Sequence, residues 1–310
     1  MNTGYSRENM AIQDSNRPFF SIIIPTYNRA KYLPMAVHSL LVQDFRAFEI
    51  IVVDDGSTDE THAMIADLAR KHPCIKYHFK NNEERSIARN YGILHATGQY
   101  IGFLDSDDKV YPNHLQVAHG LLERNDFPEV GHLGFESVSI SGKKISISNQ
   151  FDETYKEKLI HENITHGNAI FIRGDIARKI NFIPSPSAIL SEDWYLWLRL
   201  ASRYPFYFDN TVTSSVVHHD ARSLLNIDPD KLIASTNTIV RYLKRDKPFT
   251  TEYRHKTGYH YANHYTFLTL ILALTKSRRL DTVKYLIRAI WYDPTVIIRR
   301  RFLASVKHWF

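Results

Sequence analysis

The sequence predicts an α/β protein in which a mostly parallel sheet is flanked by helices and followed by a C-terminal helical region. Between residues 19 and 124, short apolar runs alternate with longer segments of helical periodicity, which is the pattern of βαβ units. From about residue 229 onward, apolar residues recur at helical spacing without this alternation. The 310 residues, 44% hydrophobic and 23% charged, are enough for one large domain or two smaller ones.

Four apolar runs in the first part of the chain predict strands, and each is followed by a predicted helix. The strands are expected at residues 19–25, 50–53, 75–79 and 100–104, and the helices at residues 32–42, 58–71, 86–96 and 113–124. Ser57, Thr58 and Asp59 are candidates to cap the second helix, because their side chains accept hydrogen bonds from free backbone N–H groups. Gly98 follows the third helix, where Gly is favoured.

The alternation breaks down after Glu129, and the predicted elements become more varied. Residues 139–145 predict a hairpin around Gly142, residues 169–172 another strand, and residues 192–203 a helix. We expect three parts: a flexible tail at residues 1–17, a domain at residues 18–225 with halves at 18–125 and 126–225, and a basic helical region at residues 226–310.

Three features of the sequence limit the location of the protein. The longest uninterrupted apolar run, residues 265–274, is about half of the roughly 20 residues that a membrane-spanning helix needs. The first ten residues lack the basic and then apolar order of a secretory signal. Cys74 is the single cysteine, so it forms no intrachain disulfide, and we interpret it as a buried or idle thiol. Together these features predict a cytoplasmic protein.

The net charge of +6 is concentrated at the C-terminal end. Residues 276–310 contain nine Lys or Arg and two Asp, whereas the rest of the chain is nearly neutral. A basic segment of this kind predicts an anionic partner, either phospholipid or nucleic acid, and the alternative is a solvated helix face.

The basic residues of this segment are mixed with large apolar ones. Apolar and cationic side chains side by side are typical of a helix that lies in a membrane interface, although an amphipathic helix also packs on its own domain. We expect partial packing, with the basic side on the inner face of the plasma membrane. The residues concerned are Trp291, Phe302, Trp309, Phe310, Arg299, Arg300, Arg301 and Lys307.

Polar residues follow three of the predicted strands. In an open parallel sheet, ligands bind at the carboxyl ends of the strands, so these residues are the first candidates for a site. The first strand is followed by residues 26–29 (TYNR), the second by residues 54–58 (DDGST) and the fourth by residues 105–108 (DSDD).

Two of these strand ends carry paired carboxylates. An aspartate after a strand is often a helix cap or a turn former, but two acidic pairs at one sheet edge repel each other unless a cation or a hydrogen-bond donor compensates. Asp105 and Asp107 are two residues apart, so in an extended segment both point the same way. The pattern therefore predicts a hard divalent cation, Mn²⁺ or Mg²⁺, between carboxylates and substrate phosphates. The first half of the chain has no glycine-rich phosphate-binding loop, which supports the same conclusion.

From Phe20 to about Tyr204, the sequence resembles the family 2 glycosyltransferases, which have the GT-A fold. The resemblance rests on four motifs in this order: SIIIPTYNR, EIIVVDDGSTD, ARNYGILHATGQYIGFLDSDD and SEDWYLWLRL. It implies a GT-A sheet with a nucleotide-binding half and an acceptor half.

The resemblance also implies a nucleotide site at the first two strand ends. Pro25, Tyr27 and Asn28 lie at the first, with Tyr27 packing on the base; Asp55 at the second hydrogen-bonds the base. A core aromatic is the alternative for Tyr27. Arg89 matches a basic position near the nucleotide, with a salt-bridge partner as its alternative, and Asp105 is expected to touch ribose or metal.

The remaining expected roles concern metal and catalysis. The resemblance implies that Asp107 binds the metal and that Asp193 is the base that deprotonates the acceptor hydroxyl, although a carboxylate at a helix start is also a common cap. His219 is a candidate third metal ligand. Glu192, His166 and Arg222 are candidates for contacts with the acceptor or the diphosphate.

The leading hypothesis is an inverting glycosyltransferase that moves a sugar from a nucleotide-diphosphate sugar, a UDP-sugar being favoured, to an acceptor hydroxyl on a sugar or lipid-linked acceptor. Surface polysaccharide or glycolipid assembly is the expected setting, and a homodimer is left open. The alternative enzyme is a metal-dependent nucleotidyl- or phosphotransferase. A nucleic-acid-binding module is disfavoured, since no such motif is recognisable.

Overall fold

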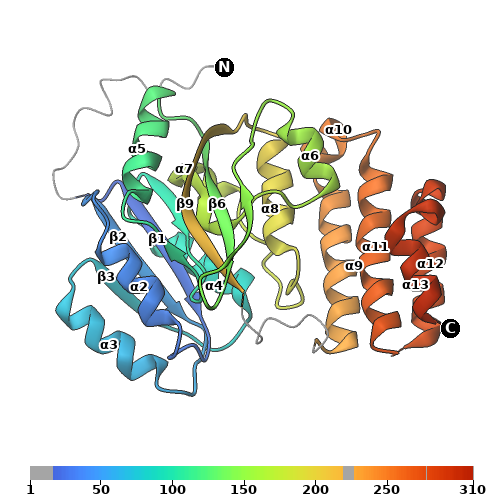
Figure 1. Cartoon of the computed structure of the whole chain (residues 1–310), viewed down its shortest axis with the longest axis horizontal. Helices are drawn as coiled ribbons and strands as arrows, with labels where there is room; N and C mark the ends of the chain where they lie inside the picture. Colours follow the sequence, from blue (N-terminus) through green and yellow to red (C-terminus); the bar gives the residue numbers. More distant parts are fainter. Residues whose placement is uncertain (1–16, 219–226, 277, 310) are drawn as a thin grey trace.

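The computed structural model describes residues 17–218, 227–276 and 278–309, with helices on both faces of a mixed sheet and a bundle of helices at one end (Figure 1). The strands are β1 (Phe20–Thr26), β2 (Phe48–Asp54), β3 (Ile75–Phe79), β4 (Tyr100–Phe103), β5 (Lys109–Val110), β6 (Val130–Ser139), β7 (Lys144–Ser148), β8 (Ile170–Arg173) and β9 (Tyr207–His218). The helices of the sheet domain are α2 (Leu33–Leu41), α3 (Thr61–Lys71), α4 (Arg85–His95), α5 (His114–Arg124), α6 (Tyr155–His161), α7 (Gly174–Lys179) and α8 (Glu192–Ala201).

The sheet has a parallel part and a mixed part. Its strand order is β3-β2-β1-β4-β8-β6-β9-β5, and β7 pairs with β6. The first four strands are parallel, which confirms the parallel arrangement expected for this half. β8 runs antiparallel to β4 and to β6, so the sheet changes direction there.

The strands β1 and β2 are buried on both faces, because helices cover each side of the sheet. Alternate residues of a strand point to opposite faces. On β1, Ile22 and Ile24 pack in one core cluster with Leu33 of α2, whereas Ile23 packs in the other cluster with Ala88 of α4. The continuous apolar run that predicted this strand therefore reflects burial on two sides.

The predicted elements agree closely with the structure as far as α5, and less closely beyond it. The hairpin around Gly142 is present between β6 and β7, with Gly142 at a φ of 82°. The sequence did not predict β5, β6, α6 or α7, and only the apolar pair Val216 and Val217 marked β9. Polar residues such as His132 and Thr213 are buried within β6 and β9, and they interrupt the apolar pattern that identified the earlier strands.

The C-terminal region is helical, as expected. It consists of α9 (Pro229–Arg245), α10 (Lys247–Glu252), α11 (Thr257–Leu274), α12 (Arg279–Tyr292), the 3₁₀ turn η4 (Pro294–Ile298) and α13 (Arg300–Trp309). One core cluster runs from Ile23 of β1 through Trp197 of α8 to Tyr285 of α12, so the bundle shares its hydrophobic core with the sheet domain. Among the described residues, no helix combines the length and the apolar character that crossing a bilayer requires.

Candidate functional site

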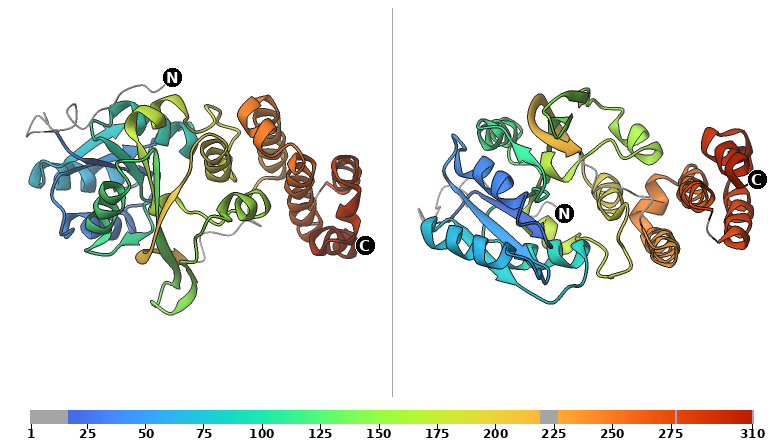
Figure 2. Two further views of the ribbon diagram at one scale, coloured as in Figure 1. Left: turned by 90° about the horizontal axis from the view of Figure 1, so that it is seen from above. Right: turned by 60° about the horizontal axis from the view of Figure 1, so that its bottom comes forward.

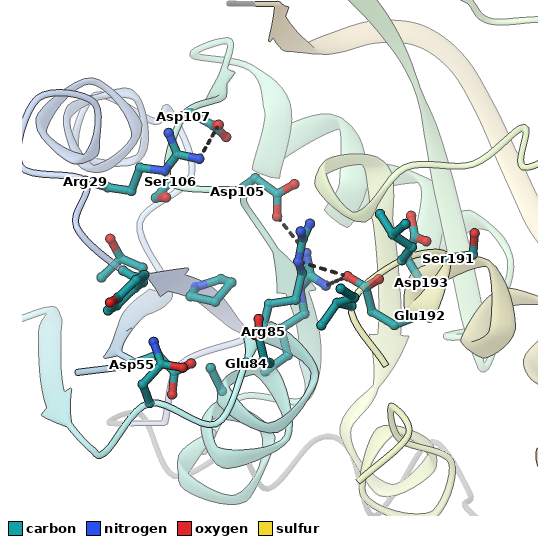
Figure 3. Close-up of a pocket in the computed structure, with 18 of the residues that line it drawn as sticks. Arg29, Asp55, Glu84, Arg85, Asp105, Ser106, Asp107, Ser191, Glu192 and Asp193 are labelled. Atoms are coloured by element: carbon teal, nitrogen blue, oxygen red, sulfur yellow. Dashed lines mark hydrogen bonds and ion pairs between the residues drawn. The ribbon is translucent and has the colours of Figure 1, made fainter. Parts of the chain in front are cut away.

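A pocket of about 520 Å³ lies at the carboxyl edge of the parallel strands, between the loops that follow β1, β2 and β4 and the start of α8 (Figure 3). Figure 3 shows Asp55 at one side of it, Asp105 near the middle, and Glu192 and Asp193 at the other side. The site residues predicted from the sequence that line it are Pro25, Tyr27, Asp55, Arg89, Asp105, Asp107, His166, Glu192 and Asp193. Loops far apart in the sequence thus converge on one cavity.

The two aspartates after β2 have different surroundings. Asp54 is fully buried and accepts hydrogen bonds from the backbone N–H of Ser57 and from the Tyr77 hydroxyl, so it holds the turn that follows the strand. Asp55 lines the pocket, and its Oδ1 accepts hydrogen bonds from Lys80 Nζ at 2.7 Å and from the backbone N–H of Glu83 at 3.1 Å. These contacts fix the orientation of the Asp55 carboxylate.

The loop after β1 presents Tyr27 to the pocket. Its side chain is 47% exposed, which excludes the alternative of a core aromatic. Asn28 has another contact: its Oδ1 accepts hydrogen bonds from the backbone N–H of Thr58, and its own N–H donates to Ser57 Oγ. Asn28 therefore ties the loop after β1 to the loop after β2, and its role as a nucleotide ligand stays a prediction.

Arg89 lies buried between two carboxylates on the pocket wall. Its Nη2 is 2.8 Å from Asp105 Oδ1, and its Nη1 is 3.0 Å from Glu192 Oε1. Burial alone would raise the pKa of Asp105, but the Arg89 guanidinium outweighs it and holds that pKa well below its usual range. The salt-bridge alternative for Arg89 is thus observed, in the interior instead of at the surface, and nucleotide contact stays a prediction.

The acidic segment after β4 is held by Asn168, which belongs to the short η1 turn (Gly167–Ala169). Asn168 Oδ1 accepts a hydrogen bond from the backbone N–H of Asp105, and its Nδ2 donates to Asp108 Oδ2. Asp108 Oδ1 accepts a further hydrogen bond from the backbone N–H of Val217, on β9. Because both Asp108 oxygens are engaged in this way, we regard Asp108 as a residue that positions the loop.

Three side chains meet the geometric requirement for holding a metal ion. Ligand atoms of Asp105, Asp108 and His166 lie within 4.8 Å of one another. Carboxylate oxygens suit both Mg²⁺ and Mn²⁺, and an imidazole nitrogen is a common ligand of first-row transition metals. Asp107, the predicted metal ligand, lines the same pocket and lies 3.7 Å from Arg29 Nη2. His219 and Arg222 lie outside the described residues, so their predicted roles stay predictions.

Asp193, the predicted base, is the second residue of the helix α8. Its Oδ2 accepts a hydrogen bond from Asn163 Nδ2 at 3.1 Å, and its Oδ1 accepts one from the backbone N–H of Trp194. Burial and the neighbouring Glu192 carboxylate raise the pKa of Asp193. A raised pKa increases the proton affinity of the carboxylate, which is what a general base near neutral pH requires.

Three non-glycine residues with strained backbone conformations lie at or beside the pocket. Asn28, Glu84 and Ser191 have φ values of 52°, 74° and 57°, in the region that non-glycine residues rarely adopt. Glu84 and Ser191 line the pocket directly. Such conformations cluster at functional sites, because the surrounding structure must hold them in place.

Sequence reasoning did not identify three residues of the site: Arg85, Lys80 and Asn168. Arg85 lines the pocket with its Nε 3.5 Å from Glu192 Oε1, one helical turn before Arg89. The spacing of Arg85 and Arg89 by four residues is visible in the sequence and was the available signal. Lys80 and Asn168 carried no signal, because their importance depends on partners distant in the sequence.

Comparisons with known proteins identify the family of the chain. The family described as "Glycosyl transferase family 2" matches residues 21–178. An uncharacterised glycosyltransferase of Rickettsia conorii is 31% identical over 256 residues, which are 78% of this chain and 40% of that protein. The chain therefore spans less than half of that relative's length.

Two solved structures share the fold. S. aureus TarS 1-349 in complex with UDP-GlcNAc has a TM-score of 0.59 at 18% sequence identity and covers 94% of this chain and 91% of its own. The mannosyltransferase PcManGT from Pyrobaculum calidifontis, in complex with GDP-Man and Mn²⁺, has a TM-score of 0.56 at 17% identity and covers 94% of this chain and 86% of its own. These likenesses establish the expected GT-A fold. The family match over residues 21–178 shows that the chain belongs to glycosyl transferase family 2.

Proposed function

We propose that this glycosyltransferase moves a sugar from a nucleotide-diphosphate sugar to an acceptor hydroxyl, with inversion at the anomeric carbon. One observation carries the proposal: a single pocket is lined by Asp55 at one side, Asp105 near the middle with Asp107 beside it, and Asp193 at the other side, although they come from three separate segments. The order matches a donor that lies across the pocket, with its base near Asp55, its diphosphate near the acidic loop and its sugar toward Asp193.

A divalent ion fits the acidic loop. Carboxylates and an imidazole suit Mn²⁺ or Mg²⁺, and ligand atoms of Asp105, Asp108 and His166 are close enough to share one ion. We propose that Asp105 holds it together with the predicted ligand Asp107, which lines the same pocket but lies outside this group of three, and that His166 or the predicted His219 is a further ligand. When bound, such an ion would neutralise the charge on the diphosphate leaving group.

Asp193 is the proposed base. Its carboxylate accepts the proton of the acceptor hydroxyl as the acceptor oxygen bonds to the anomeric carbon and the nucleoside diphosphate leaves with the electrons of the broken bond. The hydrogen bonds from Asn163 and from the backbone N–H of Trp194 hold the carboxylate in place. Since Asp193 is proposed as a base and no covalent nucleophile is assigned, the reaction is a single displacement, and inversion follows.

The ion-paired Glu192 is proposed to shape the acceptor side of the pocket together with Arg222, which lies outside the described residues. The Glu192 carboxylate pairs with Arg89 and with Arg85. Arg29, close to Asp107, is proposed to contact the diphosphate. These cations offset the negative charge of the acidic loop and of the leaving group.

The donor and the acceptor are proposed as classes of compound. The related folds bind UDP-GlcNAc and GDP-Man, which supports a nucleotide sugar, and a UDP-sugar remains favoured. The acceptor is proposed to be a sugar or a lipid-linked sugar, in surface polysaccharide or glycolipid assembly at the cytoplasmic face of the membrane. A homodimer and a nucleotidyl- or phosphotransferase activity gain no support from the family or from the contacts of the site.

The test is a set of variants assayed with a panel of nucleotide sugars and acceptors in Mn²⁺. Asp107→Ala is expected to abolish metal-dependent release of nucleoside diphosphate, and Asp193→Asn to keep donor binding while losing transfer. Asp67→Asn, an exposed carboxylate on α3, is the matched control and should retain full activity. Wild-type transfer by either site variant, pyrophosphate as the product, or retention of the donor's anomeric configuration in the product would each reject the corresponding part of the proposal.

A further inference from the structure

The outer side of α12 carries a stripe of exposed apolar residues, which we call the α12 face: Leu280, Val283, Ile287 and Trp291. Leu280, Ile287 and Trp291 are 88%, 62% and 75% exposed. Their spacings of seven and four residues place them on one side of the helix. Figure 2 shows α12 and α13 at the end of the molecule that lies away from the sheet.

The opposite side of α12 already makes the packing contacts of the helix. Tyr285 and Ala289 are buried there, and the Tyr285 ring stacks on Tyr265 of α11 at 5.6 Å. The α12 face is therefore not needed for the hydrophobic core. Large apolar residues gathered on one exposed face are unusual in a soluble protein and commonly mark an interaction surface.

Cationic residues border this face. Arg279 and Lys284 are exposed on α12, and neither has a carboxylate partner among the described residues. Of the nearby acidic groups, Asp230 pairs with Arg278 and Asp293 with Arg299, and Asp281 of α12 is a further carboxylate beside the face. The segment 276–310 carries nine Lys or Arg against two Asp, so the surface around the α12 face is strongly positive.

The combination of exposed apolar residues and exposed cations favours one kind of binding partner for the α12 face. A second copy of the chain would bring the same positive charge to the interface, which opposes association. A nucleic acid would pair with the cations but leave Leu280 and Ile287 against water or phosphate. An anionic bilayer satisfies both features, because its headgroups attract the cations and its interface takes up the apolar side chains.

We infer that the α12 face docks on an anionic phospholipid bilayer, with α12 lying in the plane of the interface. Trp291 and Ile287 enter the region between headgroups and acyl chains, and Arg279 and Lys284 remain at the level of the phosphates. The inference concerns the location of the chain and does not depend on the transfer reaction.

The structure narrows the apolar residues expected to meet the membrane. The sequence pointed to Trp291 of α12 together with Phe302, Trp309 and Phe310, but Phe302 packs on the core and Trp309 Nε1 donates a hydrogen bond to the carbonyl of Arg279. Arg299 is occupied by Asp293 and by the Tyr259 ring. Phe310 lies outside the described residues. The lipid-facing apolar stripe is therefore on α12.

The experiment is co-sedimentation of the full chain with vesicles of phosphatidylglycerol and phosphatidylcholine, compared with vesicles of phosphatidylcholine alone. Wild type is expected to bind the anionic vesicles, and less strongly as salt rises. The triple variant Leu280→Ser, Ile287→Ser, Trp291→Ser should lose most of this binding. The double variant Arg279→Gln, Lys284→Gln should weaken it about fivefold for each residue that faces the surface.

Matched controls come from the other end of the molecule. Leu94→Ser removes an apolar side chain that is 74% exposed on α4, and Arg70→Gln, Lys71→Gln removes two exposed cations of α3. Both should bind vesicles as wild type does. Unchanged thermal unfolding of every variant, and unchanged donor hydrolysis, separate this test from the proposed transfer activity.

Other results would overturn the inference. If the triple variant binds vesicles as wild type does, the α12 face does not contact lipid. If wild type forms a dimer in sedimentation velocity that the triple variant does not form, and vesicle binding is absent, a second copy covers the face. Salt-sensitive binding to RNA that the triple variant retains, without vesicle binding, would assign the cations to nucleic acid.

Discussion

The guanidinium of Arg89, on α4, lies 3.0 Å from the carboxylate of Glu192, on α8, and the two residues are 103 positions apart in the sequence. Both side chains are buried. The contact joins α4 to the first turn of α8, which carries the proposed base Asp193. The same guanidinium also contacts Asp105, so one cation links the two ends of the proposed reaction site.

Replacing Arg89 by Met should destabilise the fold. The change leaves Asp105 without its ion-pair partner and Glu192 with only the half-exposed Arg85, and removal of one partner of a buried ion pair costs about 3–5 kcal/mol. Urea unfolding measures this loss. Arg70→Met, at an exposed ion pair of α3, should change the free energy of unfolding by less than about 1 kcal/mol. An equal effect of the two variants would contradict the importance of the buried network.

Asp193→Asn should raise the melting temperature at pH 7. Burial and Glu192 raise the pKa of Asp193 in the folded state, so its ionisation at neutral pH costs stability that a neutral amide does not. With a folded pKa above the unfolded one, the Asp193 contribution is favourable at low pH and is lost as pH rises through the folded value. Thermal unfolding from pH 4 to 8 should therefore show the two proteins diverge as pH increases; parallel curves would contradict the raised pKa.

The same raised pKa sets the acidic limb of activity. Only ionised Asp193 accepts a proton, so kcat should rise with pH through the pKa of Asp193, at a higher pH than for an ordinary aspartate. Rate measurements at saturating donor and acceptor test this. Asn163→Ala, which removes one hydrogen bond to the carboxylate, should lower kcat while leaving donor binding unchanged. An unchanged kcat in that variant would show that Asn163 does not hold the base.

Asp246 should stabilise the contact between α8 and α10 in a pH-dependent way. Burial alone would raise its pKa, but hydrogen bonds from Arg203, Arg199 and the backbone N–H of Phe249 outweigh it and lower the pKa. Because the folded pKa is lowered, the stabilisation is present above the unfolded value of about 4 and is lost as pH falls through the folded value. Asp246→Asn should cost about 2 kcal/mol at pH 7 in urea unfolding, and less in acid. A difference that stays constant down to pH 2 would contradict the shift.

Gly92→Ala should destabilise the contact between α4 and β1. A Cβ at Gly92 would lie 2.5 Å from Ile23 Cγ2, which is buried within the sheet and has no room to move. Overpacking of this kind costs about 1–3 kcal/mol, more than the gain from the better helix propensity of Ala. Gly120→Ala on α5 is the control, because its Cβ would meet only Arg124 Nη1 at 3.9 Å, and it should stabilise the protein by up to about 1 kcal/mol. Urea unfolding measures the change in the free energy of unfolding for both variants. A stabilising Gly92→Ala would contradict the expected overpacking.

Adding and removing the metal should show whether Asp107 and His166 bind it. With a UDP-sugar present, Mn²⁺ should raise the melting temperature of wild type, and chelation with EDTA should reverse the effect, since a ligand of the native state stabilises it. Asp107→Ala should lose the metal-dependent increase, and His166→Ala should reduce it if the imidazole is a ligand. An undiminished increase in both variants would place the ion elsewhere. Asp59→Asn, outside the pocket, is the control.

The strands and helices of the first half were predictable because their causes are local. Burial on two faces gives β1 and β2 continuous apolar runs, and these runs alone located the strands. The acidic segment at 105–108 was also visible, since carboxylates after a strand need no partner to be recognised. β6 and β9 were not predicted, because they bury polar residues such as His132 and Thr213, whose burial depends on the surrounding strands.

The sequence by itself determined the family, the parallel part of the sheet and the identity of the acidic residues at its edge. Only the tertiary structure decided how those residues are used: that Asp108 holds β9, that Arg89 is buried between Asp105 and Glu192, and that α12 presents its apolar stripe to the outside. The physical reason is the range of the interactions. Apolar periodicity and strand ends are properties of neighbouring residues, whereas ion pairs, burial and exposure depend on which distant segments pack together.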